Sequence, residues 1–485
     1  MPTVAAPERA GGWLSATLAA MIAITAARVA LLWFNRMDLF VDEAQYWLWG
    51  QELALGYYSK PPMIGWVIRA ATDLAGSDAP FWVRLPAPLF HGVTALVLGW
   101  IAHGLWGGRA AFWVALGYVT LPMVAVGSIL VSTDTVMFPF LALALGGWIK
   151  MVRGGGRGWA VLTGLALGLA FLSKYAAIYY VICAPLAALL VRAARPRWRD
   201  ALVVLGVFAL AISPNVIWNL LNGLTTVQHT LDNADWVRDP GARAGLNLGG
   251  LAEFLASQFA VFGPVLFGAL VWRALRGARA CDMARVMLVF SLPIVAIVSG
   301  QALLSGAYAN WAAAAYLAGT LAVLPWLRAG WRAASFAVNG AACLTLPILG
   351  VFADTPLPGG RLPLERYVGL DEMSGAIIAV ARETGQKVVV ADDRDILADL
   401  FYTGRESGLR FFAVPPEGRA PHHYALKDPV PEGLEGTVLY VGRNRAPACD
   451  AGGDPVAVIA PESGAYRGTE VSVFAVPAGC WRAER

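Results

Sequence analysis

One short stretch of the chain carries most of the side chains that could do chemistry. It opens with the adjacent carboxylates Asp42 and Glu43 and closes with Lys60, directly before two prolines. A carboxylate can take a proton from an attacking hydroxyl group, and a lysine can stabilise charge that grows on a departing phosphate. We therefore expect group transfer from a phosphate-linked substrate, with Asp42 and Glu43 as the catalytic pair. Tyr46 and Tyr58 lie between the two ends and could line the substrate cavity.

The same charged residues also have structural explanations, which the sequence leaves open. Asp42 could be an acidic residue at the start of a helix, where the helix dipole stabilises it by about 0.3–1 kcal/mol. Glu43 points to another face of that helix and could hold the acceptor or pair with a cation. Lys60 could be an interfacial lysine that extends its ammonium group into water. However, Pro61 biases its backbone towards an extended form, which suits a fixed phosphate ligand.

Further candidates lie at the ends of apolar segments along the rest of the chain. Arg84 and Lys174 are cations that could bind the donor phosphate together with Lys60. Asp134 could cap the helix that follows it, because aspartate is a preferred cap, or it could line the active cavity. The remaining cavity candidates are Tyr175, His229 and Asn310. His229 could instead be an ordinary loop histidine, and Asn310 could be part of an interfacial anchor with Trp311.

The composition places most of the chain in a lipid bilayer. Of the 485 residues, 58% are hydrophobic and only 14% are charged, whereas soluble proteins carry about 25% charged residues. The net charge of +4 is spread over short turns, so no nucleic-acid partner is expected. We predict eleven membrane helices, with membrane lipid as the surrounding partner. Their ranges are Gly12–Phe34, Pro86–Trp106, Ala110–Leu130, Thr135–Met151, Trp159–Leu172, Ala176–Val191, Ala201–Ile217, Leu251–Leu275, Val286–Gln301, Tyr308–Leu327 and Ala333–Phe352.

Basic residues in alternate turns predict how the helices are oriented. Arginine and lysine are concentrated in every second turn, beginning with Arg109, and such turns face the cytoplasm. The segment Met37–Leu85 and everything after Phe352 are then expected on the opposite side, in the periplasm of a bacterial inner (cytoplasmic) membrane. The polar segment Trp218–Gly250 falls on the same side and is long enough to cover a site as a mobile loop.

The outer segments divide the chain into predicted domains. Residues 1–353 form the transmembrane catalytic domain, with residues 36–85 as its periplasmic loop, and residues 354–485 form a small soluble α/β domain. Within the loop, Asp42–Leu55 and Met63–Leu74 are expected to be helices lying along the membrane surface. In the C-terminal domain we predict one helix, Met373–Thr384, and three strands, Lys387–Ala391, Thr437–Val441 and Glu470–Val476.

Cysteines and known motifs add two constraints. Cys449 and Cys480 lie in the polar C-terminal region and could form a disulfide if that region is outside the cytoplasm; the sequence leaves this pairing open. No nucleotide-binding or nucleophile-elbow pattern is present. An outward-facing enzyme without a nucleotide site must receive an activated donor that is already anchored in the membrane.

Several motifs resemble one known family in the same order. The stretch VDEAQYWLWGQELALGYYSKPPMIGWVIRAAT, followed by WVRLPAP, is similar to the first outer loop of bacterial glycosyltransferases of the dolichyl-phosphate-mannose protein mannosyltransferase type. The lipid A aminoarabinose transferases belong to the same GT-C superfamily. STDTVMFPF, FLSKYAAIYY, SPNVIWNLLNG and ANWAAAAYLA resemble further blocks. The likeness covers roughly Arg28 to Leu327.

The resemblance implies a polytopic α-helical membrane protein with a GT-C fold. Such an enzyme transfers a sugar from a polyprenyl (undecaprenyl) phosphate by inverting displacement on the periplasmic face. Asp42 matches the family's proposed catalytic base, and Lys60 matches the lysine that contacts the donor phosphate. Ser59 replaces the glutamate that binds a metal in the aminoarabinose branch, so we predict no cofactor and no metal. The acceptor could be lipid A or other lipopolysaccharide, another envelope glycan, or a protein.

Two other classes of function remain as alternatives. A transporter or flippase of polyprenyl-phosphate sugars would be expected to show polar residues at mid-membrane and repeat symmetry between its halves, and the sequence shows neither. A membrane scaffold would instead use its C-terminal domain to bind a partner.

Overall fold

The computed structural model describes residues 10–233, 245–276, 281–443, 446–447, 449 and 453–481. The chain forms two compact units, and each is built from separate stretches of sequence. Unit 1 comprises Met1–Trp33, Ala54–Val67 and Arg84–Ile348. Unit 2 comprises Phe34–Leu53, Ile68–Val83 and Leu349–Arg485. Part of the loop that carries the candidate carboxylates thus belongs to the same unit as the C-terminal sheet.

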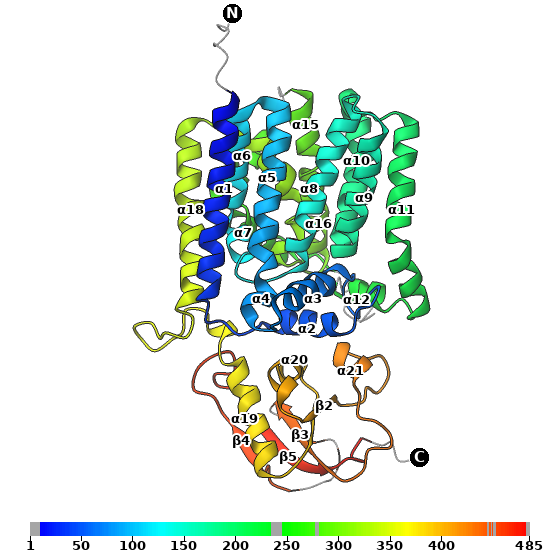
Figure 1. Cartoon of the computed structure of the whole chain (residues 1–485), viewed down its shortest axis with the longest axis vertical. Coiled ribbons are helices and arrows are strands. Elements are labelled where there is room, and N and C mark those ends of the chain that lie inside the picture. The colour runs from blue at the N-terminus through cyan, green and yellow to red at the C-terminus, as the bar shows by residue number, and fades with distance from the viewer. Residues whose placement is uncertain are drawn as a thin grey trace, which may run out of the picture. The chain divides into compact units, whose positions relative to one another are not determined.

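Unit 1 is a bundle of apolar helices, several of which run side by side in Figure 1. The helices are α1 (Ala10–Trp33), α5 (Pro86–Trp106), α6 (Gly108–Val119), α7 (Pro122–Val126), α8 (Thr133–Val152), α9 (Arg157–Ser173), α10 (Ile178–Leu190), α11 (Trp198–Leu221), α12 (Thr225–Asn233), α13 (Leu248–Val261), α14 (Pro264–Leu275), α15 (Asp282–Val289), α16 (Leu292–Leu304), α17 (Ala315–Val323) and α18 (Ala329–Val351). Short 3₁₀ turns are η1 (Tyr175–Ala177), η2 (Arg192–Ala194), η3 (Ala309–Ala312) and η4 (Leu324–Trp326).

Six of the described helical stretches are long and apolar enough to cross a bilayer, and each of the eleven predicted segments contains helix. The prediction of one continuous helix over Leu251–Leu275 was wrong. Two helices, α13 and α14, meet there at a bend of 118°. The cause is local: Gly263 has a φ of 90°, which favours glycine, and Pro264 starts the next helix, where its missing N–H group costs nothing.

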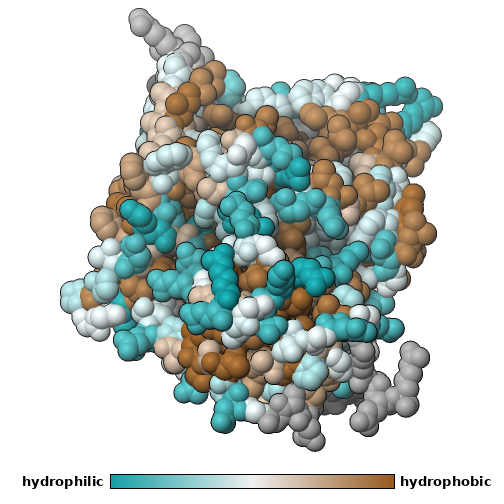
Figure 2. Space-filling view, turned by 60° about the horizontal axis from the view of Figure 1, so that its bottom comes forward, coloured by the Kyte–Doolittle hydropathy of each residue, from teal (hydrophilic) through white to brown (hydrophobic). Residues whose placement is uncertain are grey.

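Large apolar side chains cover the outside of the bundle. On α11, Leu210 and Leu221 are 74% and 80% exposed, and similar residues project from the other peripheral helices. Figure 2 shows such hydrophobic surface in brown, against hydrophilic surface in teal. Helices that bury polar side chains and expose leucine have lipid as their natural surroundings. The protein is therefore a multi-pass membrane protein.

Small residues allow the helices of unit 1 to approach one another closely. A Cβ atom on Gly164 of α9 would lie 2.6 Å from the backbone oxygen of Val204 on α11. A Cβ atom on Gly168, one turn further along α9, would lie 2.5 Å from the Cβ atom of Ala211. Because van der Waals packing drives helix association in lipid, small residues at such contacts are expected. This contact fixes α11, whose far end carries residues of the candidate site.

Unit 2 combines a five-stranded sheet with helices from two parts of the chain. Its strands have the order β2-β1-β3-β5-β4, with β1 parallel to β2 and β3, and β5 antiparallel to β3 and β4. They are β1 (Val388–Ala391), β2 (Arg410–Ala413), β3 (Thr437–Arg443), β4 (Ala457–Ile459) and β5 (Val471–Pro477). The helices are α2 (Val41–Gln51), α4 (Pro80–Arg84), α19 (Leu370–Glu383), α20 (Arg394–Thr403) and α21 (His423–Lys427). The helix α3 (Met63–Ala75) is divided between the two units. The short turns are η5 (Glu365–Tyr367) and η6 (Gly404–Glu406).

Most elements predicted for this unit are confirmed, within a few residues at each end. The two helices of the loop correspond to α2 and α3, the C-terminal helix is α19, and the three strands are β1, β3 and β5. The short strands β2 and β4 and the helices α4, α20 and α21 were not predicted. Of these, α20 has the greatest consequence for function, because it crosses from β1 to β2 and packs on α2.

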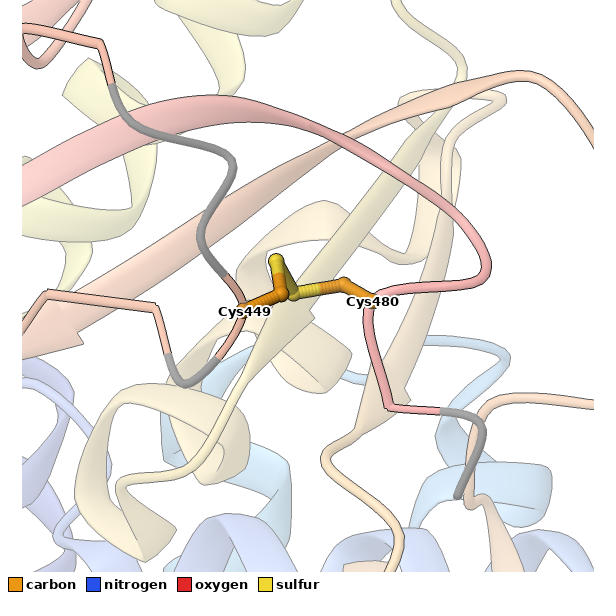
Figure 3. The surroundings of a disulfide bond; sticks show 2 residues. All are labelled: Cys449 and Cys480. Atoms are coloured by element: carbon orange, nitrogen blue, oxygen red, sulfur yellow. A yellow bond between two sulfur atoms is a disulfide. The ribbon is translucent and has the colours of Figure 1, made fainter. Parts of the chain in front are cut away.

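A disulfide joins Cys449 to Cys480 (Figure 3), with the two Cα atoms 5.2 Å apart. It links the region between β3 and β4 to the residues that follow β5. The pairing that the sequence left open is therefore present.

Candidate active site

The helix α2 carries the two candidate carboxylates in its first turn, and their environments differ. The side chain of Glu43 is almost completely buried, and its Oε2 atom accepts the backbone N–H of Phe40 at 3.0 Å. Glu43 is the third residue of α2 and Phe40 is its N-cap, so this contact is the carboxylate half of a capping box. The carboxylate of Asp42 remains 47% exposed. Of the two carboxylates, Asp42 is therefore the one available to a substrate.

An arginine of the C-terminal region fixes the position of Asp42. The Nη2 atom of Arg394 donates to Oδ1 of Asp42 at 2.5 Å, and its Nε atom donates to Oε1 of Gln45 at 3.0 Å. One guanidinium thus contacts two side chains on successive turns of α2, which its planar set of donors allows. The orientation of Asp42 is therefore set jointly by α2 and α20.

The position of Arg394 is itself determined by the start of α20. Asp393 caps this helix, because its Oδ1 atom accepts the backbone N–H groups of Asp395 and Ile396 at 2.8 and 3.2 Å. Arg443 on β3 lies 3.5 Å from the other oxygen of the cap. Arg394 is not among the site residues predicted from the sequence. The available signal was a single arginine within the acidic run Asp392-Asp393-Arg394-Asp395.

Aromatic contacts hold the rest of α2 against the same unit. The indole Nε1 of Trp47 donates to Oδ1 of Asp78 at 2.9 Å, and the ring of Trp47 meets the ring of Tyr402 edge-on, with centroids 5.0 Å apart. The hydroxyl of Tyr402 also donates to the backbone oxygen of Asp78 at 2.7 Å. Tyr46 is buried and packs against Trp49. These contacts leave α2 little freedom to turn about its axis.

The segment that carries Lys60 is fixed in unit 1 by hydrogen bonds to its backbone. Nδ2 of Asn215 donates to the oxygen of Leu55 at 2.7 Å, and the hydroxyl of Thr226 donates to the oxygen of Tyr57 at 2.6 Å. The N–H of Tyr57 donates to the oxygen of Lys60 at 3.1 Å, which closes a tight turn. We call residues 55–60 the lysine strap. Its backbone is held from α11 and α12, so the start of the Lys60 side chain has a defined position.

Two of the predicted cavity tyrosines support this strap. The hydroxyl of Tyr175 donates to Oδ1 of Asn215 at 2.9 Å and accepts from Nδ2 of Asn219 at 3.2 Å. It thereby orients the amide that holds Leu55. The ring of Tyr58 lies edge-on to His229 on α12, with centroids 5.1 Å apart. The predicted mobile loop Trp218–Gly250 is partly helical, because α11 extends to Leu221, α12 follows it and α13 begins at Leu248. Residues 234–244 of this loop, including Asp235, Trp236 and Arg238, lie outside the described residues.

Three predicted site residues from distant parts of the chain form one cluster. Nζ of Lys174 lies 2.7 Å from Oδ2 of Asp134, and Nδ2 of Asn310 donates to the same oxygen at 3.0 Å. The alternative that Asp134 caps α8 is wrong, because Ser132 occupies the cap position and accepts the N–H of Thr135. The capping position precedes the helix, whereas Asp134 lies inside its first turn.

The remaining predicted cation, Arg84, is at the end of α4, and its side chain is 1% exposed. Within the described part of the chain, no group of three or more histidine, cysteine, aspartate or glutamate side chains is arranged to hold a metal ion. The absence of a metal requirement stays a prediction.

Comparisons with known proteins define the class to which this fold belongs. The family model "Dolichyl-phosphate-mannose-protein mannosyltransferase" matches residues 59–218. Crystal structures of ArnT from Cupriavidus metallidurans, in the apo state and bound to undecaprenyl phosphate, have the same fold. Their TM-scores are 0.60 and 0.59 at 16% sequence identity, with 96% and 95% of this chain and 98% of each ArnT chain covered. The fold is therefore that of the GT-C membrane transferases.

A curated relative makes the assignment narrower. The "Lipid A galacturonosyltransferase RgtD" of Rhizobium johnstonii is 39% identical over 467 residues, which cover 95% of this chain and 98% of the relative. This chain therefore belongs to the GT-C glycosyltransferase family that includes the lipid A galacturonosyltransferases, and it is an enzyme. The transporter and scaffold alternatives are thereby set aside.

Proposed function

We propose that this enzyme transfers a sugar from undecaprenyl phosphate to lipid A at the periplasmic face of a bacterial inner membrane. The observation that carries the proposal is the 39% identity to a lipid A galacturonosyltransferase over nearly the whole of both chains. From the same relative we infer that the sugar is a uronic acid. Among the acceptors left open by the sequence, lipid A is the one that this likeness favours.

The proposed topology has eleven membrane spans within residues 1–353, with the bent pair α13 and α14 counted as one broken span. The catalytic loop 36–85 and the domain 354–485 are both proposed to lie in the periplasm. The alternating basic turns support this orientation. The disulfide between Cys449 and Cys480 supports it independently, because disulfides form in the oxidising periplasm and are rare in the cytosol. In this topology the catalytic loop binds its donor on the periplasmic side, where the activated sugar is carried by a lipid and not by a nucleotide.

The proposed reaction is a single inverting displacement. A hydroxyl oxygen of the acceptor attacks the anomeric carbon of the sugar, the bond from that carbon to the phosphate oxygen breaks, and undecaprenyl phosphate leaves with the bonding electrons. Asp42 accepts the proton of the attacking hydroxyl as general base. Its exposure and its fixed orientation against Arg394 support this role. Glu43 contributes by capping α2 and thereby holding the first turn in place.

We propose that cations stabilise the negative charge that grows on the leaving phosphate, and that Lys60 is the principal one. The fixed backbone of the lysine strap supports this role, because electrostatic catalysis depends on charges that are positioned before the reaction. Lys174 contacts Asp134, but an ammonium group has three hydrogens and can also donate to a phosphate oxygen. Arg84 is the third proposed phosphate ligand. The residues proposed to contact the substrate are Tyr58, Asp134, Tyr175, His229 and Asn310 of unit 1 and Tyr46 of unit 2.

The decisive test is the variant Asp42→Asn, assayed with purified protein, a synthetic undecaprenyl-phosphate-linked uronic acid and lipid A, with the product detected by mass spectrometry. We expect loss of transfer by at least about a hundredfold, the lower range for removal of a general base, with donor binding retained. Asp73→Asn is the matched control, since Asp73 lies in the same loop and its carboxylate pairs with Arg69 at the surface. Full activity of Asp42→Asn would remove the assignment of the base.

A further inference from the structure

A cavity at the far end of the helical bundle has features that the transfer reaction does not use. It has a volume of about 640 Å³ and lies between α14, the end of α17 with η4, and the start of α18. Asn310 of the Asp134 cluster precedes α17, and Trp326 of the cavity follows it. The cavity is therefore separated from that cluster by the length of a helix. By the proposed topology, it opens on the cytoplasmic side.

Three tryptophans and three arginines line this cavity together with small apolar residues. The six are Trp272, Trp326, Trp331, Arg273, Arg276 and Arg328. All three indole side chains are at least 46% exposed, as expected for tryptophans at the boundary between lipid and water. The guanidinium carbon of Arg276 lies 3.9 Å from the ring centroid of Trp272, and that of Arg273 lies 5.5 Å from the centroid of Trp326. These stacks hold two of the arginines at the cavity.

The positive charge at this cavity has no carboxylate partner among the residues that the structure describes. Among the described residues, no carboxylate forms an ion pair with Arg273, Arg276 or Arg328, and the buried Nε atom of Arg273 has no hydrogen-bond partner. Asp282, the acidic residue that follows Arg273 and Arg276 in sequence, contacts Arg285 instead at 3.9 Å. Buried donors such as this Nε atom normally have hydrogen-bond partners, whereas Arg276 and Arg328 are exposed and can be reached by a ligand. The missing partner should therefore be an anion from outside the chain.

We propose that this cavity binds an anionic glycerophospholipid of the cytoplasmic leaflet. The lipid phosphate would accept hydrogen bonds from the arginine forks, whose planar donors suit phosphate oxygens. One acyl chain would lie along the apolar wall formed by Val265, Gly268 and Ala269. Basic pockets between membrane helices on the cytoplasmic side are a recognised setting for anionic head groups. The bound lipid would join α14 to α17 and α18, and so stabilise the bundle.

The test measures lipid binding to the full-length protein in detergent, by native mass spectrometry and by the shift in melting temperature. Phosphatidylglycerol is the probe, with phosphatidylcholine and inorganic phosphate as comparison ligands. We expect phosphatidylglycerol alone to bind and stabilise. The triple variant R273Q/R276Q/R328Q should lose about a hundredfold in affinity, because each basic residue near anionic lipid contributes roughly fivefold, or about 1 kcal/mol.

Two further variants keep the test decisive. R192Q/R197Q/R199Q removes the same charge from another basic turn and should bind phosphatidylglycerol as the wild type does. Equal loss in this control would show general electrostatic attraction and overturn the site. Gly268→Leu places a side chain in the groove, where a Cβ atom meets nothing within 4 Å. It should weaken lipid binding without unfolding the protein. Undiminished binding there, or equal binding of phosphatidylcholine, would also overturn the proposal.

Discussion

Replacing Arg394 tests whether this residue positions Asp42 for the reaction or only stabilises the fold. In Arg394→Gln the hydrogen bonds to Asp42 and Gln45, at 2.5 and 3.0 Å, are lost or weakened together. The proposed base then gains freedom to turn away from the acceptor hydroxyl. A displacement of about 1 Å at a reacting group can cost about a hundredfold in rate. We therefore expect kcat to fall by about 10- to 100-fold, with a much smaller change in KM for the donor.

The effect on stability should be small by comparison. The side chains of Arg394 and Asp42 are 36% and 47% exposed, and ion pairs of this kind contribute about 0–1 kcal/mol. A tenfold loss in rate already corresponds to about 1.4 kcal/mol of activation free energy. Arg394→Lys keeps the charge but cannot span both partners, so its kcat should lie between those of the wild type and the glutamine variant.

The assay is initial-rate transfer to lipid A, followed by mass spectrometry, with melting temperature recorded for every variant. Arg467→Gln is the matched control. Arg467 pairs with Glu365 at 2.6 Å in the same unit, and their side chains are 43% and 27% exposed, but neither contacts α2 in any described hydrogen bond. A wild-type kcat for Arg394→Gln, or an equal loss in Arg467→Gln, would refute the reasoning.

Three other predictions concern binding and stability. Lys60→Ala should weaken donor binding by at least about tenfold, as expected for loss of a charge-assisted contact; unchanged donor affinity in a titration would count against the phosphate role. Replacing Cys449 and Cys480 with serine should destabilise unit 2 by about 3–4 kcal/mol, because the bond spans 31 residues, and an unaltered unfolding transition would contradict this. Burial and the nearby charge of Asp371 raise the pKa of Asp38 to about 7. The folded state then binds this proton more tightly than the unfolded chain, so stability should rise as the pH falls from about 8 towards 5. Asp38→Asn should weaken this dependence of stability on pH. If melting temperature plotted against pH has the same slope in the variant as in the wild type, Asp38 is not its cause.

The contacts of α2 give the C-terminal region a direct part in the proposed chemistry. The candidate base, the arginine that orients it and the aromatic pair of Trp47 and Tyr402 all belong to unit 2. From the sequence, the loop 36–85 is predicted to belong to the transmembrane domain, and the role of the C-terminal domain is left open. We propose that unit 2 supports the helix that carries the candidate base.

The sequence by itself determined the features that depend on short stretches of chain. Hydropathy located the apolar helices, and the pattern of composition located α2, α3, α19 and the strands β1, β3 and β5. The element predictions succeed because hydropathy, helix caps and turns act over a few residues, and the same residues that form an element also define it. The sequence also singled out Asp42 and Lys60 for the chemistry, and that assignment stays a prediction.

Only the tertiary structure decided which of these residues meet. Arg394 is 352 positions from Asp42, and Asn310 is 176 positions from Asp134; no local pattern connects either pair. The sharp bend between α13 and α14 likewise required a glycine conformation that hydropathy does not report. The physical reason is that contacts between residues far apart in the sequence depend on how all the helices and strands pack together. That packing is determined by the whole chain, and the residues in contact do not determine it by themselves.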